Sequence, residues 1–235
     1  MRIIDTSRRN LVHIGAFGML GAAVTPLLSA CSGDSGAKEV GAVEDLMREH
    51  GVLRRVLLVY IESVPKLRAN ASVLDASALT TAAKLFHDFG EEYHERKLEE
   101  AYIFPRVRKA GGAAASYVEV LLNQHQRGRE ITQYILGATA SGKISGGATE
   151  PLARAFETFV LMYQNHTARE DTIIFPAWKN ALSGRELDEL SDKFEDIEKE
   201  QFGEDGFENA VKQIDGIERA LGFADLAQFT APTPR

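Results

Sequence analysis

The sequence predicts an all-α protein: a four-helix up-down bundle followed by two shorter C-terminal helices. From Ala42 onward, apolar residues return at the three- and four-residue spacing of amphipathic helices, without a convincing alternating strand pattern. Gly and Pro residues separate four long apolar runs. These runs also match in pairs, which is typical of a duplicated helical hairpin packed with approximate two-fold symmetry.

The composition is that of a globular protein with a full hydrophobic core. Of 235 residues, 44% are hydrophobic and 26% are charged, which excludes a disordered chain. The 27 Lys and Arg against 34 Asp and Glu give a net charge of −7, so we expect no nucleic-acid partner. A single Cys excludes a disulfide scaffold and a thiolate metal cage.

Residues 1–30 predict an export signal peptide and residues 31–41 a flexible tether. The pair Arg8-Arg9 lies in a segment similar to the twin-arginine motif, and a Gly- and Ala-rich apolar stretch follows it. Leu28-Ser29-Ala30-Cys31 resembles a bacterial lipobox, so we expect an exported bacterial protein of the periplasm or cell envelope, anchored to the membrane through lipidated Cys31. The alternatives are a retained membrane-spanning helix and an unmodified cysteine beside a cleavage site.

Residues 42–180 contain the four long helices of the predicted bundle. The apolar runs are separated by Pro65, by Gly111-Gly112 and by the stretch from Gly142 to Gly147. Thr149-Glu150-Pro151 predicts the start of the fourth helix, because proline costs little at the first positions of a helix.

Residues 181–235 form a predicted C-terminal helical extension. Ser183 and Glu186 predict a capping box at the start of one helix. Asp205 is a candidate cap for a last helix that closes near Gly222. The acidic stretch from Glu186 to Glu200 is interpreted as a solvated helix face.

Each of the four runs carries one histidine near the middle of its apolar stripe. The four are His50, His94, His125 and His166. A lone histidine is more often a buried, hydrogen-bonded core residue, but four at repeat-related positions favour metal binding. With one carboxylate from each of two helices, they form a ligand set for two metal ions bridged by carboxylates.

The two candidate carboxylates are spaced differently from their histidines. Glu170 lies four residues after His166, on the same helix face, whereas Glu99 lies five residues after His94. One extra residue rotates a regular helix by about 100°. We therefore predict a π-type turn between His94 and Phe104 that brings Glu99 to the face of His94. Glu91 is the alternative ligand in a regular helix, and Asp171 is the alternative to Glu170.

Several neighbours of these residues have less specific interpretations. His87 is about 10 Å along the helix from His94, too far to share an ion, and is interpreted as a structural residue or a support for the ligands. Arg54 and Arg129, each four residues after a histidine, either pair with carboxylates or lie on the surface. The side chains next to the proposed ligands, Tyr93 and Tyr163, are expected in the core with buried hydroxyls.

The single histidines on the first and third helices, with His and Glu ahead of Ile103-Phe104-Pro105 and Ile174-Phe175-Pro176, resemble the hemerythrin-like (HHE cation-binding) family. The resemblance covers roughly residues 42–180. It implies a four-helix bundle with a non-haem di-iron centre. His50 and His94 would serve one iron, His125 and His166 the other, and Glu99 and Glu170 would bridge them.

The chain departs from the oxygen-carrying hemerythrins at Arg129, where their third helix has a second histidine. One iron should therefore keep an open position, which favours reactivity over reversible O₂ storage. We expect a protein that binds or reacts with O₂, NO or peroxide, whether or not it is an enzyme. The alternatives are a di-zinc or mixed-metal centre, a ferritin-like oxidase or iron-handling protein, and a metal-free, lipid-tethered helical interaction module.

Overall fold

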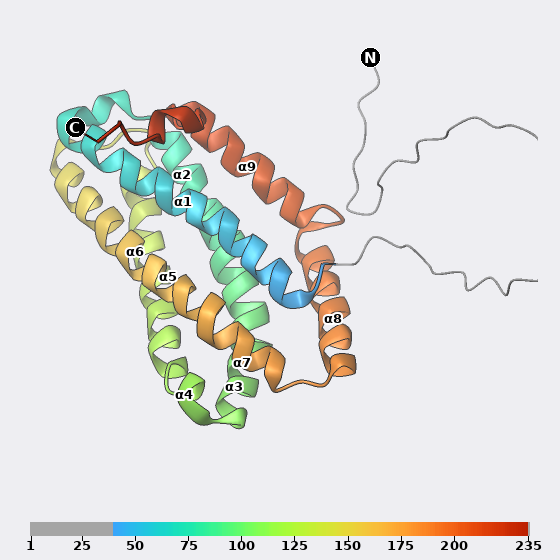
Figure 1. Ribbon diagram of the computed structural model, residues 1–235. Helices are drawn as coiled ribbons and strands as arrows, with labels where there is room; N and C mark the ends of the chain where they lie inside the picture. The colour runs from blue at the N-terminus through green and yellow to red at the C-terminus, as the bar shows by residue number, and fades with distance from the viewer. Residues whose placement is uncertain (1–39, 235) are drawn as a thin grey trace, which may run out of the picture. The chain divides into compact units, whose positions relative to one another are not determined.

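Four long helical segments lie side by side and alternate in direction, as the sequence predicts (Figure 1). The computed structural model describes residues 40–234, so the predicted export signal and Cys31 lie outside the described residues. Within residues 40–234 there is no strand, and no helix is both long enough and apolar enough to cross a bilayer. The segments are α1 (Ala42–Asn70); α2 (Ala76–Leu85) with the π-helix η2 (Phe86–Ile103) and α3 (Phe104–Ala110); α5 (Val118–Thr139); and α6 (Thr149–Arg169) with the π-helix η4 (Glu170–Ile174) and α7 (Phe175–Asn180).

Two of the predicted breaks separate helices, and one does not. Gly111, between α3 and the short helix α4 (Gly112–Ala115), and Gly112, the first residue of α4, both adopt positive φ. Short 3₁₀ turns lie at η1 (Ala71–Val73) and η3 (Gly146–Ala148), and α6 begins at Thr149 as predicted. Pro65, in contrast, lies inside α1. Pro65 is on the exposed side of the helix, while Leu67 beyond it is buried. Packing against the core therefore offsets the backbone hydrogen bond that the proline cannot donate.

The predicted wide turn between His94 and Phe104 is confirmed. The π-helix η2 spans that interval and extends back to Phe86. It is longer than the single wide turn that the five-residue spacing of His94 and Glu99 required. A second π-helix, η4, follows Glu170 in the matching segment and was not expected, because His166 and Glu170 have ordinary α-helical spacing. Both π-helices end directly before a Phe-Pro pair.

Aromatic side chains fill the bundle core at the η1 end, next to the layer of histidines. Tyr60 stacks on Phe156 with ring centroids 4.5 Å apart, and Phe86 meets Phe159 edge to face at 4.9 Å. The ring of Phe159 also contacts Tyr163. Buried aromatic pairs of this kind stabilise the packing beyond the area they bury, and here they connect α1, η2 and α6.

The C-terminal extension consists of α8 (Gly184–Phe202), α9 (Gly206–Leu221) and the 3₁₀ turn η5 (Leu226–Phe229). The predicted capping box of Ser183 and Glu186 is confirmed at the start of α8. Asp205 occupies the N-cap position of α9 but makes no side-chain capping bond, and Gly222 ends the helix in the left-handed conformation.

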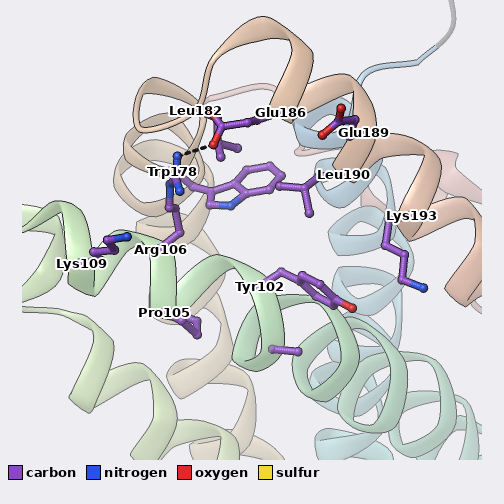
Figure 2. A pocket seen from close by; sticks show the side chains of 11 residues that line it. Tyr102, Pro105, Arg106, Lys109, Trp178, Leu182, Glu186, Glu189, Leu190 and Lys193 are labelled. Carbon is purple, nitrogen blue, oxygen red and sulfur yellow. Dashed lines mark hydrogen bonds and ion pairs between the residues drawn. The ribbon is translucent and has the colours of Figure 1, made fainter.

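Helices α8 and α9 lie along one side of the bundle, with α9 beside α1 and α2 (Figure 1). Arg106 of α3 donates to Glu186 at the start of α8 at 2.9 Å (Figure 2). A surface pocket of about 600 Å³ lies along this seam, between Tyr102, Trp178 and Leu190. The interpretation of α8 as a solvated acidic face is wrong for Glu198, which is buried and accepts a hydrogen bond from the Phe207 N–H.

Two glycines of α5 test how closely the helices pack. A Cβ on Gly128 would overlap the Tyr163 hydroxyl, whereas a Cβ on Gly137 would meet nothing within 4 Å. We expect Gly128→Ala to lower the free energy of unfolding by about 1–3 kcal/mol through overpacking. Gly137→Ala, the matched control, should raise it by about 0.5–1 kcal/mol through helix propensity. Urea unfolding followed by circular dichroism measures both, and equal effects would contradict the packing argument.

Candidate metal centre

Six predicted side chains meet in the middle of the bundle. Each of the four long segments contributes one histidine, and the two π-helices contribute the glutamates. All six side chains are buried, with at most 2% of their surface exposed. They are His50, His94, Glu99, His125, His166 and Glu170.

The histidines form two pairs, each made by two helices. His50 and His94 face each other with their Nε2 atoms 3.0 Å apart. His125 and His166 do the same at 3.1 Å. The pairs therefore come from the two halves of the repeat, one pair from each hairpin.

Each glutamate reaches both histidine pairs. The two carboxylate oxygens of Glu99 lie 3.4 Å from His94 Nε2 and 3.3 Å from His125 Nε2. Those of Glu170 lie 3.6 Å from His50 Nε2 and 2.9 Å from His166 Nε2. Two carboxylates placed between two imidazole pairs have the arrangement that a bridged two-metal site requires.

The outward-facing nitrogen of every histidine meets an oxygen acceptor. His50 Nδ1 lies 2.7 Å from Asp171, and His94 Nδ1 lies 2.6 Å from Glu49. His125 Nδ1 and His166 Nδ1 each lie 2.9 Å from an acceptor. These last two acceptors are Glu100 and Gln124. Such partners fix the tautomer and the orientation of a ligating imidazole.

A second layer holds these acceptors and rings in place. Arg54 pairs with Asp171, and Arg129 pairs with Glu100, so both arginines pair with carboxylates, one of the two interpretations left open by the sequence. The two tyrosine hydroxyls are satisfied as expected, Tyr93 by Glu49 at 2.9 Å and Tyr163 by Glu95 at 2.7 Å. The phenylalanines of the two Phe-Pro pairs stack on the histidines: Phe104 on His125 at 5.4 Å and Phe175 on His50 at 5.3 Å.

The donor set fits a pair of cations. With Nδ1 donating outward, each Nε2 presents a lone pair to the interior, and two such lone pairs about 3 Å apart repel each other. All four carboxylate oxygens of Glu99 and Glu170 are buried without a hydrogen-bond partner. Buried polar atoms are normally satisfied, so these groups are arranged for ions that accept electron pairs.

Without metal, protons have to balance the buried charges. Burial disfavours the charged form of His94, but the carboxylates of Glu99 and Glu49 outweigh it and raise its pKa. Burial and the nearby Glu99 carboxylate raise the pKa of Glu170 well above its ordinary value. Burial and the neighbouring His125 lower the pKa of His166 to about 3. A bound cation competes with these protons, so metal binding is expected to release them.

Three candidate residues lie outside the cluster. The alternative ligand Glu91 is fully buried, and neither of its oxygens has a hydrogen-bond partner, but it is not among the groups close enough to share an ion with the histidines. His87 is partly exposed and pairs with Asp88 at 2.7 Å. The alternative Asp171 lies on the outer side of His50.

The sequence reasoning missed the acceptors Glu49, Glu100 and Gln124 as functional residues, and it considered Asp171 only as an alternative ligand. A signal was present, because each stands next to a proposed ligand at matching places in the repeat: Glu49-His50 with Gln124-His125, and Glu99-Glu100 with Glu170-Asp171. The spacing alone does not show that each acceptor serves a histidine of a different helix.

Glu91 predicts a pH dependence of stability in the metal-free chain. Burial, with a smaller contribution from Glu95, raises its pKa from 4.5 to about 7. The folded state therefore holds this proton more tightly than the unfolded state, and stability falls as the pH rises through this interval. We expect the free energy of unfolding to fall by roughly 2–3 kcal/mol more in the wild type than in Glu91→Gln between pH 5 and pH 8. Denaturant unfolding at both pH values measures the difference, and parallel pH profiles would contradict it.

The chain matches known proteins over most of its length. The hemerythrin HHE cation-binding domain family matches residues 41–178. The uncharacterized protein Rv1995 of Mycobacterium tuberculosis is 40% identical over 237 residues, covering 95% of this chain and 90% of that protein. The uncharacterized protein Mb2018 of Mycobacterium bovis shows the same identity and coverage. No solved structure matches the chain significantly.

The family match coincides with the part of the chain that forms the four-helix bundle and holds the buried His/Glu cluster. By its sequence and by its fold, the chain belongs to the hemerythrin HHE cation-binding domain family.

Proposed function

We propose that this protein holds two iron ions and uses them to bind or react with O₂ or a related small oxidant, NO or peroxide. The observation that carries the proposal is the arrangement of electron-pair donors: four Nε2 atoms that face inward in two close pairs, and four carboxylate oxygens without hydrogen-bond partners. Imidazole and carboxylate together suit iron, although zinc or a mixed pair fits the same donors.

In this proposal His50 and His94 hold one ion, and His125 and His166 hold the other. Glu99 and Glu170 reach both pairs and serve as bridges. A pair of iron ions supplies electron transfer to a small oxidant. The chain's own residues orient the imidazoles, and the bundle core shields the site from bulk water.

The arginines that follow the ligands support reaction rather than storage. Arg129, four residues after His125, pairs with Glu100 and Glu95 and supplies no metal ligand to the cluster. Arg54, four residues after His50, likewise pairs with Asp171. Each proposed ion therefore has two imidazoles and shared carboxylates, which leaves coordination positions for an exogenous ligand.

The alternatives have less support. A ferritin-like oxidase would use Glu91 together with His94, but Glu91 lies outside the cluster, and Tyr163 stands at the matching position of the fourth segment. A metal-free interaction module does not explain four orphaned carboxylate oxygens. Export and lipid attachment at Cys31 stay predictions of the sequence.

Metal analysis combined with spectroscopy tests the proposal. The purified full chain should contain about two irons and show near-ultraviolet charge-transfer absorption that changes on exposure to O₂ or NO. Removing the iron should lower the melting temperature, because a ligand that binds the folded state alone stabilises it, by about 2.7 kcal/mol at a hundred times its dissociation constant. A chain that takes up no iron and shows no shift in melting temperature would refute the proposal.

Histidine variants separate ligands from bystanders. We expect His94→Ala and His166→Ala each to lower the iron content by about one ion per chain, because each removes one of two imidazoles from a pair. His87→Ala is the matched control, since His87 is partly exposed and lies outside the cluster. It should retain the full iron content. Equal iron loss in all three variants would contradict the assignment.

A further inference from the structure

The two halves of the cluster are related by the repeat but differ at one acceptor. His94 is supported by Glu49, whereas the corresponding His166 is supported by Gln124. Glu49 and Gln124 occupy the same place in the repeat, directly before His50 and His125. The first pair of imidazoles is thus backed by a carboxylate where the second pair has a neutral amide.

The acceptors of the other two histidines, His50 and His125, are of the same kind. Asp171 serves His50 and is paired with Arg54, while Glu100 serves His125 and is paired with Arg129. Both are carboxylates, and each is paired with a guanidinium. Glu95, which also pairs with Arg129, lies 3.9 Å from His125 Nδ1, so each half has two carboxylates near its histidines. The halves differ in the group that accepts the Nδ1 proton, a carboxylate for His94 and an amide for His166.

The surroundings of the two acceptors also differ. Glu49 is 1% exposed, receives the Tyr93 hydroxyl as well as His94, and lies within 4.8 Å of carboxylate oxygens of Asp45 and Glu198. Helix α8 supplies Glu198, and its Phe202 ring packs edge to face on Tyr93 at 5.3 Å. This side of the cluster is covered and rich in carboxylates.

Gln124 has a more open environment. It is partly exposed on α5. The residue at the place of Tyr93 is Asn165, which donates to the carbonyl of Leu161 in its own helix. Gln124 therefore lacks a counterpart of the hydrogen bond that the Tyr93 hydroxyl donates to Glu49.

We propose that the two metal positions are unequal and that Glu49 makes the His50–His94 position the tighter one. An imidazole whose Nδ1–H donates to a buried carboxylate is a stronger electron-pair donor than one that donates to an amide. The His125–His166 position binds its ion more weakly. This inference rests on the proposed function, because it concerns the same six ligands.

Exchanging the two acceptors tests the inference with matched variants. Zn²⁺ is a suitable probe because it has no redox chemistry, and calorimetric titration of the metal-free full chain gives the stepwise constants. We expect two steps that differ about 10- to 100-fold in the wild type. Glu49→Gln should weaken the tighter step about tenfold or more, and Gln124→Glu should strengthen the weaker step. The double exchange should leave two steps with the order of filling reversed.

Crystals of the chain loaded with less than one equivalent of Zn²⁺ locate the tighter position directly. Anomalous scattering should appear between His50 and His94 in the wild type, and between His125 and His166 after the double exchange. Two equal steps, or a wild-type signal at His125 and His166, would overturn the inference and leave the two-metal proposal standing. Failure to bind any Zn²⁺ or iron would overturn both.

Discussion

The structure of this bundle depends on the inward convergence of four imidazole lone pairs. Each ring is fixed by an acceptor at its outer nitrogen, so the inner nitrogen of a neutral ring carries a lone pair, and the inner nitrogens of each pair lie about 3 Å apart. Two buried carboxylates add negative charge at the same point. Such a core is unfavourable by itself, and protons or metal ions must offset the repulsion.

The helix geometry follows from this requirement. A glutamate five residues after a histidine would lie about 100° away from it on a regular α-helix. The π-helix η2 brings Glu99 to the face of His94, and the oxygens of Glu99 then reach both histidine pairs. In the fourth segment Glu170 already has the right spacing, and η4 begins at that residue. The stretch between each glutamate and its Phe-Pro pair is widened in both segments.

The C-terminal helices break the symmetry that the repeat creates. Helix α8 contributes Glu198 and Phe202 next to Glu49 and Tyr93, on the side of His94. Gln124, on the other side, stays partly exposed. The extension therefore gives the two histidine pairs different surroundings. It lies beyond residues 41–178, the part of the chain that the family matches.

Local patterns in the sequence were sufficient to predict the helical fold, the four histidines of the cluster and the wide turn before Phe104. These follow from apolar periodicity, from the spacing of the repeat and from the one-residue offset between His94 and Glu99. The course of α1 through Pro65 and the burial of Glu198 were decided by packing against the core, which overrides local preference. The same holds for the choice between Glu99 and Glu91, and for the acceptor of each histidine. The partners in those contacts lie 25 to 121 residues apart, and only the folded bundle determines which of them meet.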